Sequence, residues 1–127
     1  MAAAARPAPR SLVPFAHVSS VPRSILFYRN LGFEVGNTFV PSGETEPAWA
    51  WLESDRAQLM LARASAPVLA DQQAVLFYVY VDDVAAARSA LAEAGVSVGE
   101  IERPFYAPRG EFRVHDPDGY VLMITHT

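Results

Sequence analysis

Histidine and carboxylate side chains are the groups of this sequence best suited to acid–base or metal chemistry, but their spacing brings none of them together. His17, His115 and His126 fall on separate expected elements, so no pair has the one-turn spacing with which two histidines hold an ion on a helix. An isolated histidine is more often a structural hydrogen-bonding group than a general base. We therefore predict no catalytic residue, interpret His115 and His126 as structural or solvated, and keep His17 as a residue that contacts a ligand.

The composition excludes several classes of chemistry. The chain has 127 residues, all ten of its basic residues are arginine, and it has no cysteine. Without lysine no side chain forms a Schiff base, and without cysteine there are no thiol nucleophiles, disulfides or thiolate metal ligands. The net charge of −4 is spread without acidic or basic blocks, which argues against a nucleic-acid partner.

Long apolar segments are also absent from the sequence. No run reaches the ~18 residues of a membrane-spanning helix, so no membrane partner is expected. The start, MAAAARPAPR, is broken by two prolines and lacks the apolar core of a signal peptide. We expect residues 1–11 to form a flexible arm and the protein to be cytoplasmic.

An internal repeat organises the rest of the chain. Residues 18–35 align with residues 81–98 at an offset of 63 without a gap. Each segment follows a β-like stretch, contains a helical pattern and stops at a glycine. Ser20 and Asp83 stand where helix N-caps belong. The adjacent carboxylates Asp82 and Asp83 are therefore interpreted as the start of a helix rather than as a catalytic pair.

Strand-like segments follow each predicted helix. They are expected at 33–39, 48–53 and 57–63 in the first half, and at 96–101, 111–115 and 120–126 in the second. The last two are joined by Asp116-Pro117-Asp118-Gly119, a strong turn signal. The pattern predicts an α+β fold of two tandem βαβββ modules, about 12–63 and 74–126, joined by 64–73 within one domain, 12–127.

Alternation divides the strand residues between two faces. One face is almost uniformly apolar and suits packing beneath the helices. The other face combines aromatic rings with a few polar groups, which is typical of a ligand cavity; it includes Phe15, His17, Trp49, Trp51, Tyr78 and Tyr80. A half-solvated sheet surface is the alternative, although so many exposed rings would be unusual for a monomer.

A long loop at 102–110 contains prolines and aromatic residues, and long loops are often functional. Phe105, Tyr106 and Arg109 are predicted to cover the cavity as a lid, with an ordinary solvated loop as the alternative. Glu111 and Arg113 share one parity on the following strand. They are expected either to pair with charges of a ligand or to lie at the margin of the sheet.

Three stretches carry a family resemblance: VPRSILFYRNLGFEV, YVYVDDVAAARSALAEAGV and GEFRVHDPDGYVLMI. Over about residues 12–126 the chain resembles the vicinal-oxygen-chelate superfamily, which includes glyoxalase I, extradiol dioxygenases and the fosfomycin- and bleomycin-resistance proteins. The resemblance implies paired βαβββ modules whose curled mixed sheets enclose a cavity, and it implies a homodimer. Because this fold hosts several reactions as well as pure binding, it does not by itself name the function.

The metal ligands of the family's metal-dependent members map onto apolar residues of this chain. Those members use His or Gln on the first strand of each module and Glu on the final strand, and glyoxalase I adds a carboxylate on its fourth strand. By the resemblance these positions are Val13, Leu76 and Met123, with Met60 near that of the added carboxylate. Divalent ions need several oxygen or nitrogen donors, so we predict no metal and no cofactor, with Met123 filling space in the ligand site.

We therefore expect a metal-free binding protein, closest in character to the bleomycin-resistance members, that sequesters an aromatic or planar small molecule such as an antibiotic. The predicted ligand-binding residues are His17, Trp49, Trp51, Tyr78, Tyr80, Phe105, Tyr106, Arg109, Glu111 and Met123. One alternative is a glyoxalase-, lyase- or dioxygenase-like enzyme, acting through misassigned metal positions or through His17, Glu53, Glu111 or a tyrosine. A module that only mediates protein association is the other.

Overall fold

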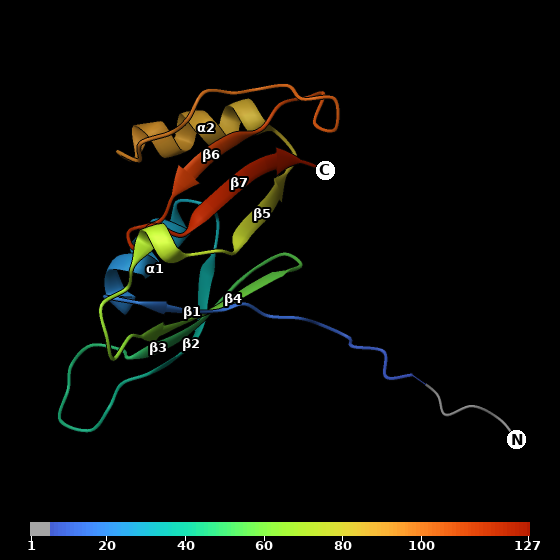
Figure 1. The fold of residues 1–127 in the computed structure, drawn as a ribbon. Helices are drawn as coiled ribbons and strands as arrows, with labels where there is room; N and C mark the ends of the chain where they lie inside the picture. The colour runs from blue at the N-terminus through green and yellow to red at the C-terminus, as the bar shows by residue number, and fades with distance from the viewer. Residues whose placement is uncertain (1–5) are drawn as a thin grey trace, which may run out of the picture.

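Two modules in tandem make up the structure, a computed structural model that describes residues 6–127 (Figure 1). The first module contains β1 (Phe15–Val18), α1 (Val21–Arg29), β2 (Glu34–Phe39), β3 (Trp49–Ser54) and β4 (Ala57–Arg63). The second contains β5 (Leu76–Val81), α2 (Val84–Glu93), β6 (Phe112–His115) and β7 (Val121–His126). A short 3-10 helix, η1 (Ala70–Gln72), lies in the segment between them. The predicted α+β class is confirmed.

The two helices begin and end alike, at positions related by the repeat. The side chains of Ser20 and Asp83 each accept a hydrogen bond from the backbone NH three residues further on, at 3.2 Å and 2.9 Å. After each helix the chain turns through a glycine with positive φ, 96° at Gly32 and 87° at Gly95, a conformation that costs a side-chain-bearing residue free energy. The predicted N-caps are confirmed.

Each module contributes one sheet, and the repeat extends to the register of the strands. The first sheet has the order β1-β4-β3-β2 and the second β5-β7-β6. The pairs β1–β4 and β5–β7 are parallel, and the other pairs are antiparallel. Phe15 pairs with Met60 and Tyr78 pairs with Met123, so the same offset relates both parallel pairs.

The predicted strand at 96–101 is wrong. This stretch makes two isolated antiparallel bridges, Val98 with Val114 and Glu102 with Glu111. The register changes by one residue between these bridges, which interrupts the ladder of hydrogen bonds. The second sheet therefore has three regular strands, where the sequence pattern predicts four.

The apolar faces of both sheets pack beneath the helices and form one continuous core. Val18 and Leu61 of the first sheet and Ile124 of the second have no exposed surface. The same cluster includes Tyr28 of α1 and Leu91 of α2. Each large apolar side chain buried in this way stabilises the fold by ~1.5–3 kcal/mol, so the core fixes the position of the opposite, mixed faces.

The two sheets stay separate within one chain. Among residues 6–127 no strand of the first sheet pairs with a strand of the second, and Figure 1 shows the sheets as a lower and an upper body. An enclosed cavity therefore stays a prediction. Of the predicted arm, residues 1–5 lie outside the described residues, and residues 6–11 are exposed and lead away from both sheets. None of the described helices has the length and apolar character needed to span a bilayer.

Candidate functional site

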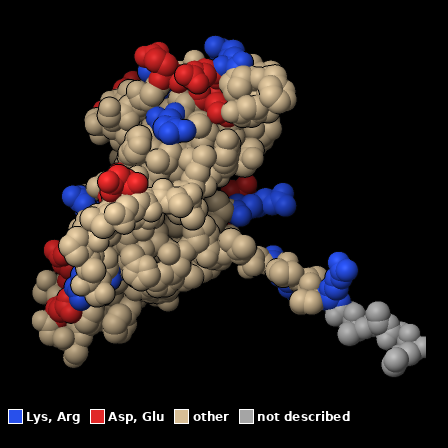
Figure 2. All heavy atoms as spheres, in the orientation of Figure 1, with Lys and Arg blue, Asp and Glu red and all other residues tan. Residues whose placement is uncertain are grey.

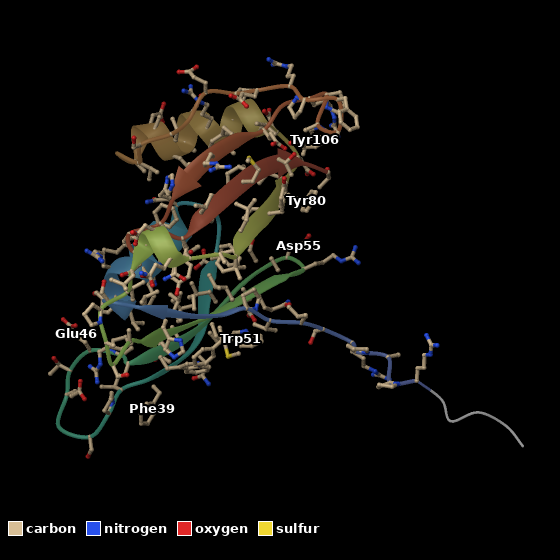
Figure 3. The ribbon with its side chains drawn as sticks, viewed as in Figure 1. Phe39, Glu46, Trp51, Asp55, Tyr80 and Tyr106 are labelled. Atoms are coloured by element: carbon tan, nitrogen blue, oxygen red, sulfur yellow. The ribbon has the colours of Figure 1, made fainter. Side chains whose placement is uncertain are left out.

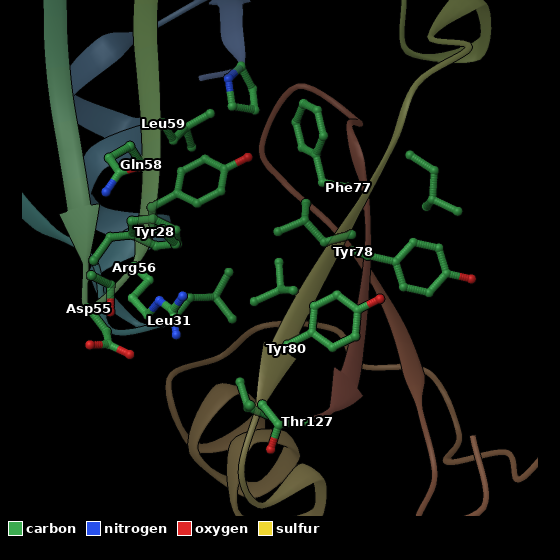
Figure 4. A pocket seen from close by; sticks show the side chains of 18 residues that line it. Tyr28, Leu31, Asp55, Arg56, Gln58, Leu59, Phe77, Tyr78, Tyr80 and Thr127 are labelled. Carbon is green, nitrogen blue, oxygen red and sulfur yellow. The ribbon is translucent and has the colours of Figure 1, made fainter. Parts of the chain in front are cut away.

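A cleft of about 660 Å³ separates the two modules (Figure 4). Its apolar lining comes from the segment after α1, from β4 and from β5, and includes Leu31, Phe33, Leu59, Phe77 and Val79. Its polar lining includes Asp55, Arg56, Gln58, Tyr78 and Tyr80. Apolar walls with a few placed polar groups are the usual composition of a small-molecule site.

The front of the narrower middle of the molecule is mostly uncharged. Figure 2 shows two lobes joined by a middle that is mainly tan, with charged side chains at its left and right edges. Several aromatic side chains of the mixed faces are exposed, among them Phe15 at 49% and Tyr80 at 63%. A ligand bound to these faces would therefore be held mainly by aromatic and apolar contact.

The mixed face of the first sheet presents two half-buried tryptophans. Trp49 and Trp51 lie on β3, with side chains opposite to the buried residues of that strand. Trp51 Nε1 donates a hydrogen bond to Glu53 Oε2 at 2.9 Å, which ties the indole along the strand. A Cβ on Gly36 would lie 2.9 Å from Trp51 Cδ1, so this glycine leaves the room that the indole occupies.

His17 lies on the same sheet, in β1. Its side chain is exposed, and its ring meets the ring of Phe15 edge-on with centroids 5.2 Å apart. Its backbone carbonyl accepts a hydrogen bond from Tyr120 Oη at 2.8 Å. The backbone of His17 thus helps to join the modules, while its imidazole faces outward.

The mixed face of the second sheet carries tyrosines and a buried carboxylate. The rings of Tyr78 and Tyr80 lie 6.3 Å apart, and Tyr78 pairs with Met123 of β7. Glu111 stands immediately before β6, and its side chain takes this face because Phe112 takes the core side. Glu111 is 5% exposed, so it is the most buried of the predicted ligand residues.

The predicted lid, residues 102–110, is anchored at one end and exposed at its tip. The NH of Arg109 donates to His126 Nε2 at 3.1 Å, and the Arg109 guanidinium donates to the carbonyl of Thr127. Phe105 is 95% exposed, and its ring meets that of Tyr106 edge-on at 5.3 Å. The two rings at the tip are thus available to a ligand, whereas Arg109 holds the loop to the end of β7.

The predicted ligand residues fall into two groups on different sheets. The first group is His17, Trp49 and Trp51; the second is Tyr78, Tyr80, Phe105, Tyr106, Arg109, Glu111 and Met123. Figure 3 shows Trp51 beside the lower sheet and Tyr80 and Tyr106 beside the upper one. Tyr78 and Tyr80 line the cleft and neither tryptophan does, so the cleft does not bring the two predicted walls together.

Asp55, Arg56 and Gln58 also line the cleft, and the sequence interpretation does not include them. The stretch between the strands expected at 48–53 and 57–63 carries no predicted role in binding. The repeat contains a signal for this turn. Its offset of 63 aligns Asp55 with Asp118, so the turn corresponds to the Asp116–Gly119 turn of the second module. Asp55 has a φ of 45°, rare for a residue other than glycine, which marks the turn as tight.

The positions that hold a metal in other family members do not fit an ion here. Val13, Met60 and Met123 are half-buried and Leu76 is exposed on the mixed faces. None of these side chains has an oxygen or nitrogen donor, and one or two thioethers do not satisfy a hard or borderline divalent ion. Within residues 6–127 no three His, Asp or Glu side chains come close enough to form an alternative site.

The Asp116–Gly119 turn joins the second module to the first. Asp116 is buried. Its Oδ2 accepts a hydrogen bond from Tyr28 Oη at 2.7 Å, and its Oδ1 accepts from the NH groups of Asp118 and Tyr120, both at 2.9 Å. Burial raises the pKa of the Asp116 carboxyl above its ordinary 3.8, although these hydrogen bonds act in the opposite direction. Burial and then the charge of Asp116 raise the pKa of the Tyr28 phenol, so the phenol stays a donor.

Asp118 makes a second connection to the start of α1. Both of its carboxylate oxygens accept the NH of Ser19 at 3.1 Å, and the Ser19 hydroxyl donates to Oδ1. The Arg23 guanidinium donates to Ser19 Oγ at 2.7 Å and lies 3.8 Å from Asp118 Oδ1. We call Asp116, Asp118, Ser19, Arg23 and Tyr28 the latch.

Comparisons with known proteins place this fold. A model of the Glyoxalase/Bleomycin resistance protein/Dioxygenase superfamily matches residues 14–124. None of the curated proteins matches the sequence. A bleomycin resistance determinant encoded on the transposon Tn5 has a similar structure, with a TM-score of 0.74 and 16% identity over 94% of this chain and 98% of its own.

Two Streptomyces proteins are similar as well. TnmS3, an antibiotic binding protein from Streptomyces sp. CB03234, gives a TM-score of 0.73 and 20% identity over 96% of this chain and 98% of its own. The bleomycin-binding protein from bleomycin-producing Streptomyces verticillus was solved with copper(II)-bleomycin. It gives a TM-score of 0.71 and 20% identity over 96% of this chain and 99% of its own. At these identities the likeness establishes the fold.

Proposed function

Because the chain belongs to the glyoxalase/bleomycin resistance protein/dioxygenase superfamily, we propose that it binds an aromatic or planar small molecule, such as an antibiotic, and sequesters it without a metal ion and without turnover. The observation that carries this proposal is the composition of the mixed faces. Met60, near one ligand position of the metal-dependent relatives, lies between Phe15 and Trp51, and Met123, at another, pairs with Tyr78. Similar structures include proteins described as bleomycin-binding and antibiotic binding, which supports the same class of ligand.

A homodimer is part of this proposal. The mixed faces of one chain leave Phe15, Tyr78 and Tyr80 exposed, and such a concentration of aromatic surface favours a partner. A second copy related by a two-fold axis is the commonest solution. In such a dimer the tryptophan face of one protomer would oppose the tyrosine face of its partner, which would create the two walls that a single chain keeps apart. Sedimentation at micromolar concentration tests this: a mass near that of one chain, 13.8 kDa, would refute it.

Tryptophan fluorescence offers a direct test of ligand binding. We expect at least one compound in a panel of planar antibiotics and aromatic metabolites, bleomycin included, to change the emission of Trp49 or Trp51. Trp51→Ala should weaken its binding about tenfold or more, because both apolar burial and ring stacking are lost. Leu26→Ala serves as the control, since Leu26 is exposed on α1. Unfolding of both variants is measured alongside, so that a loosened fold is recognised.

Elemental analysis of protein purified without chelators separates binding from metal-dependent catalysis. We expect no stoichiometric zinc, nickel, iron or manganese, because Val13, Leu76, Met60 and Met123 offer no suitable donors. About one tightly held ion per chain would overturn the metal-free proposal and favour an enzyme of the same superfamily. A cytoplasmic location also stays a prediction, which fractionation of the producing cells would test.

A further inference from the structure

The carboxylate of Glu111 lies in an unusual environment. The side chain is 95% buried, with 5% of its surface exposed. Among the described residues its Oε1 has no hydrogen-bond partner. A buried polar atom without a partner costs on the order of 1–3 kcal/mol, and more when it is charged. Oε1 of Glu111 is therefore able to accept a hydrogen bond from another molecule.

Within residues 6–127 no cation forms an ion pair with this carboxylate. The ion pairs within residues 6–127 are Arg23–Asp118, Arg63–Glu44 and Arg88–Glu100, so Arg113, on the same strand face as Glu111, does not pair with it. The backbone of Glu111 is fixed, because its NH and carbonyl both bond to Glu102 at 2.9 Å. The carboxylate is thus held in place without a counter-charge.

The strand register places Glu111 across β7 from Tyr80 on the mixed face, because Tyr80 pairs with Thr125 and the neighbouring Ile124 pairs with Phe112. Tyr78 and Tyr80 come from β5, with ring centroids 6.3 Å apart, and Tyr106 comes from the tip of the loop. The charge of Glu111 is the largest of the causes that raise the pKa of the Tyr106 phenol, and a hydrogen bond between the Tyr106 and Glu111 side chains is among the smaller ones, while Oε1 itself stays without a partner. Tyr106 is 59% exposed, so its ring is accessible to a ligand.

We propose that Glu111, together with Tyr78, Tyr80 and Tyr106, forms a site for a protonated amine carried by the aromatic ligand. The ammonium group would donate a charge-assisted hydrogen bond to the unpartnered Oε1, and the electron-rich faces of the phenol rings would attract the cation. This inference rests on the proposed function and narrows it: the ligand combines a planar ring system with an amine that is protonated at neutral pH.

A matched pair of probes tests the inference on the full-length chain. Naphthylethylamine carries the ammonium group, and naphthylethanol has the same ring and spacer without the charge. By titration calorimetry at pH 7, we expect the amine to bind the unmodified protein about tenfold or more tightly than the alcohol. In Glu111→Gln this preference should fall to about twofold or less. Glu102→Gln removes an equal charge from an exposed neighbour and should keep the tenfold preference.

Further measurements distinguish a Glu111→Gln variant that has lost its fold from a protein that has no amine site. Thermal unfolding of Glu111→Gln should occur no earlier than that of the unmodified protein, because the amide replaces an unpaired buried charge. Tyr106→Ala, which keeps the carboxylate, should weaken amine binding about threefold or more. Equal binding of amine and alcohol, binding of neither probe at millimolar concentration, or the same loss in both glutamine variants would overturn the inference. An antibiotic that quenches Trp51 but binds Glu111→Gln unchanged would overturn it as well, while leaving the proposed function intact.

Discussion

Two hairpin turns occupy corresponding places in the repeat, but they behave differently. The Asp116–Gly119 turn leads into β7 and packs against the start of α1, whereas Asp55-Arg56 leads into β4 and lines the cleft. Asp116 is buried and accepts three hydrogen bonds. Asp55 is exposed, and its side chain bonds to no group of residues 6–127. One turn therefore holds the modules together, and the other borders the space between them.

The reason lies in the helix segment that each turn could meet. The repeat offset pairs the latch residues Ser19, Arg23 and Tyr28 with Asp82, Ala86 and Leu91. Tyr28 supplies the phenol that Asp116 requires, but buried Leu91 supplies no donor. Asp82 would repel an approaching carboxylate where Ser19 attracts one. The duplicated fold is thus closed at one end by three residues that differ between the repeats, and the cleft lies open at the other end.

Among the substitutions that test this difference between the turns, Asp116→Ala should lower the free energy of unfolding the most. It leaves the Tyr28 phenol and two backbone NH groups buried without an acceptor, at a cost of about 3–5 kcal/mol in the free energy of unfolding. Asp55→Ala is the matched control and should stay within about 0.5 kcal/mol. Urea unfolding followed by tryptophan fluorescence measures both. Equal effects of the two substitutions would mean that the latch does not hold the modules.

Gly119→Ala should have the next largest effect. Gly119 has a φ of 91°, and a Cβ there would overlap the Cβ of Ala70 in η1. Gly43 also has a positive φ, 82°, but nothing lies within 4 Å of its place for a Cβ. Gly43→Ala should cost about 1 kcal/mol from backbone strain alone, and Gly119→Ala about 2–3 kcal/mol because the clash adds to it. Similar unfolding midpoints for the two variants would show that η1 moves away from the added Cβ at little cost in free energy.

The same contrast explains what could be predicted from the sequence. Ser20, Asp83 and the strand faces follow from local patterns, since caps and alternation depend on neighbours in the chain. The bond between Tyr28 and Asp116 joins residues 88 positions apart, and no local pattern indicates it. The predicted strand at 96–101 failed for a related reason: its residues suit a strand, but pairing with β6 breaks where the register shifts. The open cleft depends on how the modules pack, which the repeat alone does not specify.

Tyr28→Phe tests one hydrogen bond of the latch, the bond from Tyr28 Oη to Asp116 Oδ2. The ring keeps its edge-on contacts with Phe27 and Phe33, but Asp116 Oδ2 loses its donor, so we expect a cost of about 1–2 kcal/mol at pH 7. Tyr80→Phe removes a phenol hydroxyl from the exposed side of the cleft and should stay within about 0.5 kcal/mol. Chemical unfolding of both variants gives the two values. A cost in Tyr80→Phe as large as in Tyr28→Phe would contradict the distinction between a closed and an open end.

The pH dependence of Tyr28→Phe is the smallest effect and tests the latch carboxylate itself. Burial raises the pKa of Asp116 above its ordinary 3.8, so between that value and the folded-state pKa the folded chain binds more protons than the unfolded chain. In that window the contribution of Asp116 to the free energy of unfolding falls as the pH rises, and above it the contribution is constant. The Tyr28 hydrogen bond lowers this pKa, so Tyr28→Phe should raise it further and widen the window. The cost of the substitution should therefore shrink as the pH is lowered from 7 toward 3.8, because protonation removes the buried charge that the phenol stabilises. A cost that stays constant or grows over this range would show that the phenol acts through packing rather than through its hydrogen bond to the carboxylate.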